Sequence, residues 1–480
     1  MTPYDIIIIG GGVVGCAIAR DLSRYKLRIA VLEKEEELAF GVSKSNSGIV
    51  HPGTQNPPGS LKGRLCVRGN LLTRKICGEL GVDFKQVGEL IVIFDKDKMR
   101  RLKRLKKEAE ALGVPRLSIV DAAWLKRREP NLNPKAAAAL YAPTAGIVSP
   151  YRLVYDLSEN AAANGARFCT LAKVEAITRI PGRAARFEIS TARGIFKSRY
   201  VINAAGLFAD EVSSMVGVDD FRIRPRKGEE FILDKKRELL TNHLLFPLPT
   251  ETSKGVLVIK TSDGNPMIGP TAEEIDDKED HATTDRGLRN VLESVRQMIP
   301  SISEKDIIAY FAGLRPAAGN DFIIRSETKV PGFINVAGIQ SPGLTAAPAI
   351  AVMVRGLLRE AGLPFVKKTL FHRHRPKTVH LFSIPLARTK QLIKKDADYG
   401  DIVCRCEMVS AKEVSDAIRR GARTLDGVKF RTRAQAGRCH GSFCTGRVMK
   451  MLAELSRRPI TEITKRGPGS EVIKADRNNG

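Results

Sequence analysis

The chain has 480 residues, which is too long for one ordinary hydrophobic core, so two or three domains are expected. A hydrophobic content of 43% together with 41 glycines excludes a disordered chain and favours a folded α/β protein. The net charge is +26, but no nucleic-acid-binding motif accompanies it, so we expect no nucleic-acid partner.

Hydrophobic periodicity and turn residues divide the chain into an α/β region, a linker and a small C-terminal domain. Residues 5–33 contain a buried strand, a glycine turn, a helix and a second strand, which together form a βαβ unit. Residues 370–395 are rich in Arg, Lys, His and Pro and predict a linker, whereas residues 466–480 predict a frayed tail. The other predicted elements are, in chain order, loops over 41–63, a charged helix over 96–112, Pro-punctuated loops over 130–150, a helix over 152–164, a buried strand over 200–206, antiparallel strands within 221–269, a buried strand over 333–338 and a helix over 343–360.

Three glycines follow the first predicted strand in the pattern Gly10-x-Gly12-x-x-Gly15. Glycine at these positions permits a tight turn, a close approach of the backbone to a pyrophosphate, and close packing of the helix on the strand. The N-terminus of that helix offers amide donors to the phosphates, and Glu33 is placed to accept hydrogen bonds from ribose hydroxyls. The motif therefore predicts a dinucleotide site, but by itself it does not separate FAD from NAD.

Four of the eight cysteines form a pattern near the C-terminus: Cys404-x-Cys406, then 32 residues, then Cys439-x4-Cys444. A 2Fe–2S cluster is held by four thiolates, two on each iron, and this pattern supplies a close pair at each end. Zinc is the main alternative, although structural zinc sites prefer C-x2–4-C spacing, and redox disulfides are a further one. The other four cysteines are scattered and are expected to be small core residues.

Along most of residues 1–365 the chain resembles FAD oxidoreductases of the D-amino-acid-oxidase type, in particular the glycerol-3-phosphate dehydrogenase branch and the related L-2-hydroxyglutarate oxidases. Six motifs carry the resemblance: SNSGIVHPG over 45–53, PGSLK over 58–62, LYAPTAGIVSP over 140–150, INAAG over 202–206, FAGLRP over 311–316 and NVAGIQSPGLT over 335–345. The resemblance implies a Rossmann-like FAD-binding domain with an inserted α+β substrate domain built on an antiparallel sheet. It is specific for an FAD enzyme and much less specific for the substrate.

The resemblance also implies where FAD lies. Ser45–Gly48 would line the flavin and its phosphates, Val174 would contact the adenine through its backbone, and Ala205–Gly206 would pack near the pyrophosphate. Residues 338–345 would run beneath the isoalloxazine, where a helix starting near Gly343 aims its amides at the flavin O2/N1 edge. The implied FAD residues are Gly10, Gly12, Val13, Val14, Gly15, Glu33, Lys34, Ser45, Asn46, Ser47, Gly48, Val174, Ala205, Gly206, Gly313, Arg315, Gly338, Ile339, Ser341, Gly343, Leu344 and Thr345.

A flavin dehydrogenase needs a base that takes a proton as hydride leaves, and a cation that holds an anionic substrate. His51 is the expected base, because it is the only histidine in a motif-bearing loop and imidazole titrates near neutral pH. Arg315 matches the substrate arginine of the family and would grip a carboxylate or phosphate with two hydrogen bonds. Lys260 is a candidate second cation. An ordinary structural role is the alternative for each of these residues.

Two positions depart from the family pattern. Related chains usually carry histidine where this one has Asp263, and tyrosine is common where this one has Glu230. Carboxylates beside the substrate would disfavour a dianionic ligand unless they point away from it. Glycerol 3-phosphate remains the first expected substrate, and 2-hydroxy acids and amino or imino acids are the alternatives.

Residues 401–452 resemble the bacterioferritin-associated-ferredoxin domain, in the version fused to flavoproteins such as the anaerobic-type glycerol-3-phosphate dehydrogenases. This resemblance implies a small helical 2Fe–2S domain, with short helices near 411–420 and 446–455. The expected organisation is an FAD-dependent oxidoreductase over 1–370 (FAD-binding parts 1–80, 146–210 and 305–365; substrate-binding parts 81–145 and 211–304), a linker over 371–396, a 2Fe–2S domain over 397–460 and a tail over 461–480.

We therefore expect an FAD-dependent dehydrogenase that passes electrons singly through a 2Fe–2S cluster to a partner subunit or carrier. An electron-transfer subunit without its own substrate is the alternative of another class. Residues 365–480 carry 26 Lys and Arg against 11 Asp and Glu, so this region could dock an acidic carrier or an anionic membrane, or be a solvated surface. With no targeting signal and no transmembrane helix expected, the predicted location is the cytoplasm, either free or at the inner face of the membrane.

Overall fold

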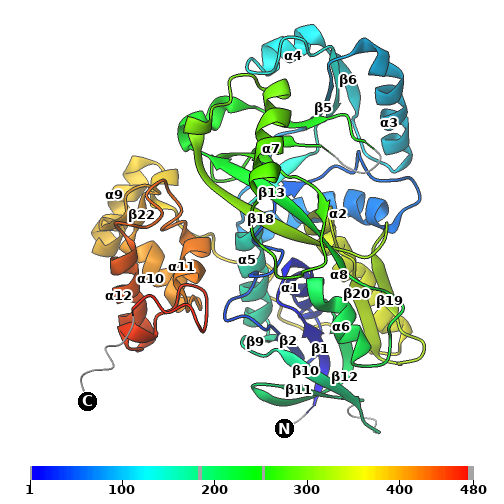
Figure 1. Cartoon of the computed structure of the whole chain (residues 1–480). Helices are drawn as coiled ribbons and strands as arrows, with labels where there is room; N and C mark the ends of the chain where they lie inside the picture. The colour runs from blue at the N-terminus through cyan, green and yellow to red at the C-terminus, as the bar shows by residue number, and fades with distance from the viewer. Residues whose placement is uncertain (1–2, 182–185, 251–254, 474–480) are drawn as a thin grey trace.

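The computed structural model describes residues 3–181, 186–250 and 255–473 (Figure 1). Its first sheet has eight strands. The parallel strands at its centre are, in spatial order, β20 (Phe333–Ala337), β12 (Gly194–Asn203), β1 (Tyr4–Ile9), β2 (Ile29–Leu32) and β9 (Arg167–Cys169). Antiparallel strands extend the sheet, namely β11 (Phe187–Thr191) beside β12, β10 (Val174–Arg179) beside β11, and β19 (Ile323–Ser326) beside β20.

Four helices cover one face of this sheet and a second core covers the other, so its central strands are buried on both faces and are continuous apolar runs. These helices are α1 (Val13–Leu22), α2 (Leu61–Leu80), α5 (Pro150–Ala163) and α8 (Gly343–Glu360), and they pack against one another around a shared core. The opposite face carries a second core beneath α6 (Ala209–Ser214). The succession β1–α1–β2 confirms the predicted βαβ unit, and α8 has the predicted bounds.

The second sheet has nine strands and is almost entirely antiparallel, as predicted for 221–269. Only β14 (Leu244–Pro247) and β5 (Glu89–Ile93) run parallel to each other within it. In spatial order the other strands are β17 (Glu273–Glu274), β13 (Arg224–Leu233), β16 (Pro266–Gly269) and β15 (Leu257–Lys260) before β14, and β7 (Ala138–Ala142) and β6 (Ser118–Asp121) after β5, while β18 (Ile307–Ala317) pairs with β13. α3 (Met99–Ala111), α4 (Ala122–Arg128) and α7 (Asp285–Met298) lie against this sheet (Figure 1).

A small sheet of β3 (Ile49–Val50), β8 (Gly146–Val148) and β4 (Phe84–Gln86) joins the two larger parts. The C-terminal domain consists of a hairpin, β21 (Ile402–Cys404) and β22 (Val409–Ser410), followed by α10 (Ala411–Arg419), α11 (Leu425–Thr432) and α12 (Thr445–Ser456) around its own core. α10 begins in a capping box, in which the Ser410 hydroxyl accepts from the Glu413 N–H and the Glu413 carboxylate accepts from the Ser410 N–H. The two short helices predicted for this domain are α10 and α12.

Three sequence interpretations need correction. Residues 130–150, interpreted as loops, contain β7 and β8, because proline and glycine flank two short strands that are too brief to show a period. Residues 370–395, interpreted as linker, include the helix α9 (Leu386–Lys395). β18 lies at the start of a part grouped with FAD binding, yet it belongs to the second sheet. Within the described ranges, no helix is both long and apolar enough to span a bilayer.

Candidate active site and cluster site

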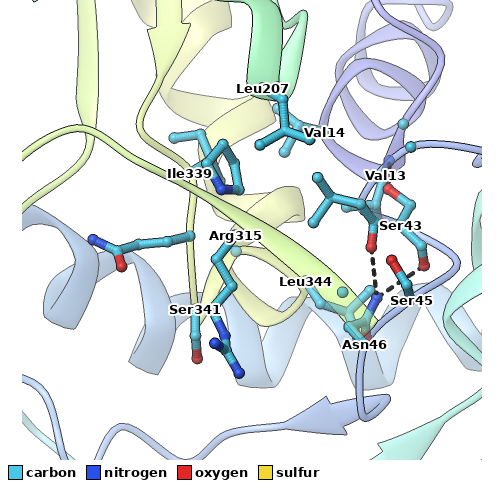
Figure 2. A pocket seen from close by; sticks show the side chains of 18 of the residues that line it. Val13, Val14, Ser43, Ser45, Asn46, Leu207, Arg315, Ile339, Ser341 and Leu344 are labelled. Carbon is cyan, nitrogen blue, oxygen red and sulfur yellow. Dashed lines mark hydrogen bonds between the residues drawn. The ribbon is translucent and has the colours of Figure 1, made fainter. Parts of the chain in front are cut away.

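A cavity of about 790 Å³ lies between the glycine turn after β1, the N-terminus of α8 and the second sheet. It is large enough for a dinucleotide cofactor, since ligand sites generally span about 300–1,000 Å³. All of the predicted FAD residues line this cavity except Gly15, Gly338 and Thr345. In Figure 2, Val13 and Val14 approach it from α1, while Arg315, Ser341 and Leu344 approach it from another side. The structure therefore gathers residues as far apart in the sequence as Gly10 and Leu344.

The glycine turn is built as a dinucleotide motif requires. Gly10 has φ +109°, and a Cβ there would lie 2.4 Å from the Ala204 carbonyl oxygen. Gly15 does not reach the cavity, but a Cβ at this position would lie 2.0 Å from the Gly10 carbonyl oxygen, so it allows α1 to pack on β1. The Glu33 carboxylate accepts from the Gly11 N–H at 2.8 Å, and burial raises its pKa. Glu33 thus lies at the cavity wall beside the turn.

The first turns of two helices face the cavity, at α1 and at α8. Gly12, Val13 and Val14 supply the first, and Gly343 and Leu344 the second. Helix N-termini carry unpaired N–H groups and a positive partial charge, which suits a pyrophosphate at one end and an electron-rich flavin edge at the other. The residues present therefore fit FAD.

His51 lines the cavity from the loop that follows β3. Its Nδ1 lies 3.8 Å from the Glu89 carboxylate, which is completely buried on β5 and accepts from the Thr54 hydroxyl at 2.5 Å. The His51 N–H donates to the Thr345 hydroxyl at 2.9 Å, so Thr345, although outside the cavity, fixes the backbone of this loop. A buried carboxylate at this distance stabilises the imidazolium that forms when His51 takes up a proton.

Arg315 enters the cavity from β18, where it is half-buried, and its side chain extends beside Ser341 (Figure 2). Its Nη1 donates to the Thr271 carbonyl at 3.4 Å. A Cβ at Gly228, on the adjacent strand β13, would lie 2.7 Å from the guanidinium, so this glycine leaves room for the arginine. Burial lowers the pKa of Arg315 and the nearby Glu230 raises it. A cation therefore stands in the cavity wall, where it could bind an anionic group.

Glu230 also lines the cavity and is only 3% exposed. The Ser47 hydroxyl donates to its Oε1 at 3.1 Å, while its Oε2 accepts no hydrogen bond from any residue of the described ranges. Burial raises the pKa of Glu230 to about 7, although Arg315 and Ser47 act in the opposite direction. The carboxyl group is therefore partly neutral near pH 7, which reduces its repulsion of an anion.

The concern about a second carboxylate applies less to Asp263, because this residue is not among the described residues that line the cavity. It is paired with Arg152 at 3.2 Å and with Arg433 at 3.3 Å, and it accepts from the Tyr151 hydroxyl at 3.0 Å. Burial acts to raise the pKa of Asp263, but the two arginines lower it to about 2. Lys260, the predicted second cation, is not among the described residues that line the cavity.

The four predicted cluster ligands come together in the C-terminal domain as two pairs. The Cys406 and Cys439 sulfurs are 3.5 Å apart, and Cys404 is hydrogen-bonded to Cys444. Each pair joins a cysteine of the first close pair in the sequence, Cys404 and Cys406, to one of the second, Cys439 and Cys444. The spacing had suggested that the contacts would form within each close pair. Within the described ranges, no three His, Cys, Asp or Glu side chains are grouped as for a single metal ion.

Backbone amides surround these sulfurs. The N–H groups of Glu407 and Gln435 donate to Cys404, and those of Gly441 and Phe443 donate to Cys439. Thiolate sulfurs that accept several N–H bonds are typical of iron–sulfur sites, where such bonds tune the reduction potential. Four cysteines in two pairs, enclosed by amide donors, fit a 2Fe–2S cluster with two thiolates on each iron.

A buried carboxylate of the first domain holds the C-terminal domain in place. Glu37, which is 2% exposed, accepts from the N–H groups of Arg423 and Thr424 at the start of α11 and pairs with Arg431 at 2.8 Å. Arg431 in turn lies 3.7 Å above the Tyr155 ring of α5. Glu37 follows residues 33–35, which line the cavity, so this docking contact lies next to the dinucleotide end of the site.

A second contact joins the two domains through Arg433. This side chain binds Asn265 at 2.9 Å and Asp263 on the turn between β15 and β16, and it also pairs with Glu407 at 3.2 Å. Glu407 directly follows the ligand Cys406. Sequence reasoning missed this contact, since nothing in the sequence pairs residues that lie 170 positions apart.

Comparisons with known proteins agree with this geometry. The family model described as FAD dependent oxidoreductase matches residues 5–357, and the model of the BFD-like 2Fe-2S binding domain matches residues 402–454. The two matches separate the chain close to the predicted linker. Together they assign FAD and a 2Fe–2S cluster as its cofactors.

Individual relatives match over different parts of the chain. A glycerol 3-phosphate dehydrogenase of Caloramator mitchellensis is 40% identical over 98% of both chains. A glycerol 3-phosphate oxidase of Mycoplasma pneumoniae is 32% identical over 77% of this chain and 97% of its own. The structure of the dithionite-reduced L-alpha-glycerophosphate oxidase of the same organism, with FAD bound, covers 78% of this chain and 98% of its own with a TM-score of 0.73 and 31% identity. The chain therefore belongs to the FAD dependent oxidoreductase family, with a BFD-like 2Fe-2S binding domain at its C-terminal end.

Proposed function

We propose that this protein oxidises sn-glycerol 3-phosphate to dihydroxyacetone phosphate and passes the electrons to a partner protein. The observation that carries the proposal is a cavity that places a histidine, His51, and a half-buried cation, Arg315, on the walls of one FAD site. The similarity to a glycerol 3-phosphate dehydrogenase over 98% of both chains supports this choice of substrate.

The reaction removes a hydride from C2 of the substrate and a proton from the 2-hydroxyl group. When bound, FAD supplies the hydride acceptor and the 2Fe–2S cluster supplies a one-electron carrier. His51 takes the hydroxyl proton and is stabilised in its protonated form by Glu89. Arg315 holds the phosphate with its planar guanidinium and so orients C2. Two electrons and two protons leave the enzyme for each substrate oxidised.

The matched dehydrogenase and the matched oxidase differ in whether they match the last quarter of this chain. The match to the oxidase takes in 97% of the oxidase but only 77% of this chain. Almost nothing of the oxidase is therefore left that could correspond to the C-terminal domain. The matched dehydrogenase spans that domain as well. An added one-electron carrier suits an enzyme whose acceptor is a protein instead of oxygen, and we infer that this chain is a dehydrogenase.

An anaerobic titration tests the choice of substrate. Purified holoenzyme is mixed with glycerol 3-phosphate, L-2-hydroxyglutarate or an amino acid, and the flavin band is followed. Glycerol 3-phosphate is expected to bleach the flavin at the lowest concentration. Bleaching only by L-2-hydroxyglutarate would replace the substrate. Bleaching by none of them would favour an electron-transfer subunit without its own substrate.

Arg315→Met is expected to raise the KM for glycerol 3-phosphate about 10- to 150-fold, because hydrogen bonds to a charged group typically contribute about 1.5–3 kcal/mol. Steady-state kinetics with a dye acceptor measures this effect. The matched control is Arg296→Met, which removes a half-exposed guanidinium on α7 that does not line the cavity. A KM within twofold of the parent value for Arg315→Met would show that Arg315 does not hold the substrate.

Glu230 is expected to make substrate binding weaker as the pH rises. Its pKa of about 7 means that the carboxyl group is neutral below pH 7 and negative above it, beside the group that binds the anion. The ratio of the parent KM to the KM of Glu230→Gln should therefore rise, by roughly tenfold, between pH 6 and pH 8.5. Taking the ratio cancels titration of the substrate phosphate itself. A ratio independent of pH would contradict this role.

A further inference from the structure

The C-terminal domain presents an exposed face next to its cluster ligands. We define the cluster face as Arg405, Cys406, Met408, Arg438, His440 and Phe443, all of which are exposed. Of the four ligand cysteines, Cys406 is the exposed one, whereas Cys404 and Cys444 are buried and Cys439 is intermediate. Cys406 and Cys439 are in contact, so the residues that adjoin them in the sequence surround one small area.

The cluster face carries a strongly exposed aromatic side chain. Phe443 is 88% exposed, the largest value among the large hydrophobic residues that are exposed, although its own N–H is tied to the Cys439 sulfur. Met408 beside Cys406 is 40% exposed. An exposed aromatic residue in the middle of a polar surround is the usual anchor of a protein interface.

The charge that this face shows to solvent is positive. Arg405 is exposed, and Arg438 remains 67% exposed although it pairs with Asp234 at 2.6 Å. The carboxylates nearby are covered. Glu407 has only 4% of its side chain exposed and is held by Lys235 and Arg433, and Asp234 has 12% exposed. A partner with an acidic surface would therefore meet arginines and not carboxylates.

We propose that the cluster face is the docking site of an acidic one-electron carrier protein, which accepts electrons at Cys406. This inference rests on the proposed function for the source of the electrons, but the docking itself does not depend on the substrate. Each docking event moves one electron, so two carrier molecules are reduced for every substrate oxidised. Charge complementarity would steer the encounter, and Phe443 would anchor the complex.

A pair of probes that differ only in charge tests the proposal. Cytochrome c is basic, and its succinylated form, in which lysines have become carboxylates, is acidic with the same haem. Binding of each oxidised probe to the oxidised holoenzyme is measured by calorimetry from low to high salt. The succinylated form is expected to bind at least about tenfold more tightly at low salt, and the difference should vanish as the Debye length shrinks. Equal binding, tighter binding of the native form, or no binding of either would overturn the proposal.

Variants locate the binding site. Arg405→Glu is expected to weaken binding of the succinylated probe about 3- to 30-fold, because it replaces an attraction with a repulsion. Phe443→Ser should weaken it at least about 5-fold. The matched control is Lys103→Glu with Lys107→Glu, which reverses two exposed charges on α3 at the far end of the molecule (Figure 1). A control that weakens binding as much as Arg405→Glu would show that only the net charge attracts the probe, and the proposal would fail.

Three further measurements separate this proposal from its alternatives. The visible spectrum of the cluster shows whether Arg405→Glu and Phe443→Ser retain it, and if one variant loses it, the other variant, compared with the control, still locates the binding site. Flavin bleaching by glycerol 3-phosphate is recorded separately, so a wrong substrate leaves the docking result intact. In the last measurement, binding of the protein to phosphatidylserine vesicles is followed. If they bind and both variants abolish that binding while the succinylated probe is ignored, the face is a membrane contact and the proposal is wrong.

Discussion

Replacing His51 by asparagine is expected to lower the rate of flavin reduction by glycerol 3-phosphate about 10²- to 10⁴-fold, the usual contribution of a general base. Asparagine fills much of the same space but cannot take up the hydroxyl proton. The Glu89 carboxylate, completely buried and 3.8 Å from the imidazole, then loses the charge that it stabilises. Stopped-flow absorbance measures this single step when dioxygen is excluded and the enzyme is in excess over the substrate.

The effect should lie in the chemical step and not in substrate binding. We therefore expect the substrate dissociation constant of the asparagine variant to stay within a few-fold of the parent value, because Arg315 is intact. His372→Asn, which alters a histidine in the segment before α9, is the matched control and should reduce its flavin at the parent rate. If His51→Asn reduced its flavin as fast as the parent enzyme does, His51 would have no part in the mechanism.

The second large effect concerns the cluster. Cys406→Ala is expected to abolish cluster binding and to lower turnover with protein acceptors. Loss of a group that only hydrogen-bonds to a metal ligand typically costs about 10- to 100-fold, and loss of the ligand itself should cost more. Cys406 is exposed, so its loss removes a ligand with little change in packing. Flavin reduction by substrate should persist at the parent rate, since His51 and Arg315 lie in the other domain.

Iron and sulfide analysis, together with stopped-flow flavin bleaching, separates the two halves of this expectation. Cys169→Ala is the matched control, because Cys169 is partly exposed at the end of β9 and lies outside the C-terminal domain. Should Cys406→Ala keep its iron and its turnover with protein acceptors, the four-cysteine assignment would be wrong. Loss of flavin reduction along with the iron would instead mean that the two domains depend on each other for folding.

Local patterns carried most of what the sequence predicts about the fold. The run Ile6–Ile9 is wholly apolar because β1 is covered on both faces, and the glycines after it are fixed by close backbone contacts such as that of Gly15 with Gly10. α8 was bounded correctly at Gly343, where a loop of glycine and proline gives way to a long apolar helix. By contrast, β7 and β8 are too short to reveal a period, and α9 has no buried residue, so its polar sequence looks like a linker.

The site was predictable where residues belong to one motif and unpredictable where they meet across the fold. Ser45–Gly48 and residues 339–344 lie on the cavity because each is one continuous segment of the chain. Asp263 could not be placed from the sequence, because its partner Arg433 belongs to the other domain. The role of Glu230 likewise depends on burial and on Ser47, and neither is visible from the sequence around position 230.

The proposed function requires electron flow from substrate through flavin to cluster within one chain. Rapid freezing of anaerobic holoenzyme after mixing with glycerol 3-phosphate, followed by electron paramagnetic resonance, tests it most directly. We expect the flavin band to fall first and the signal of the reduced 2Fe–2S cluster to rise afterwards in the same sample. A flavin that bleaches while the cluster stays oxidised, or a cluster reduced before any flavin is bleached, would contradict the account.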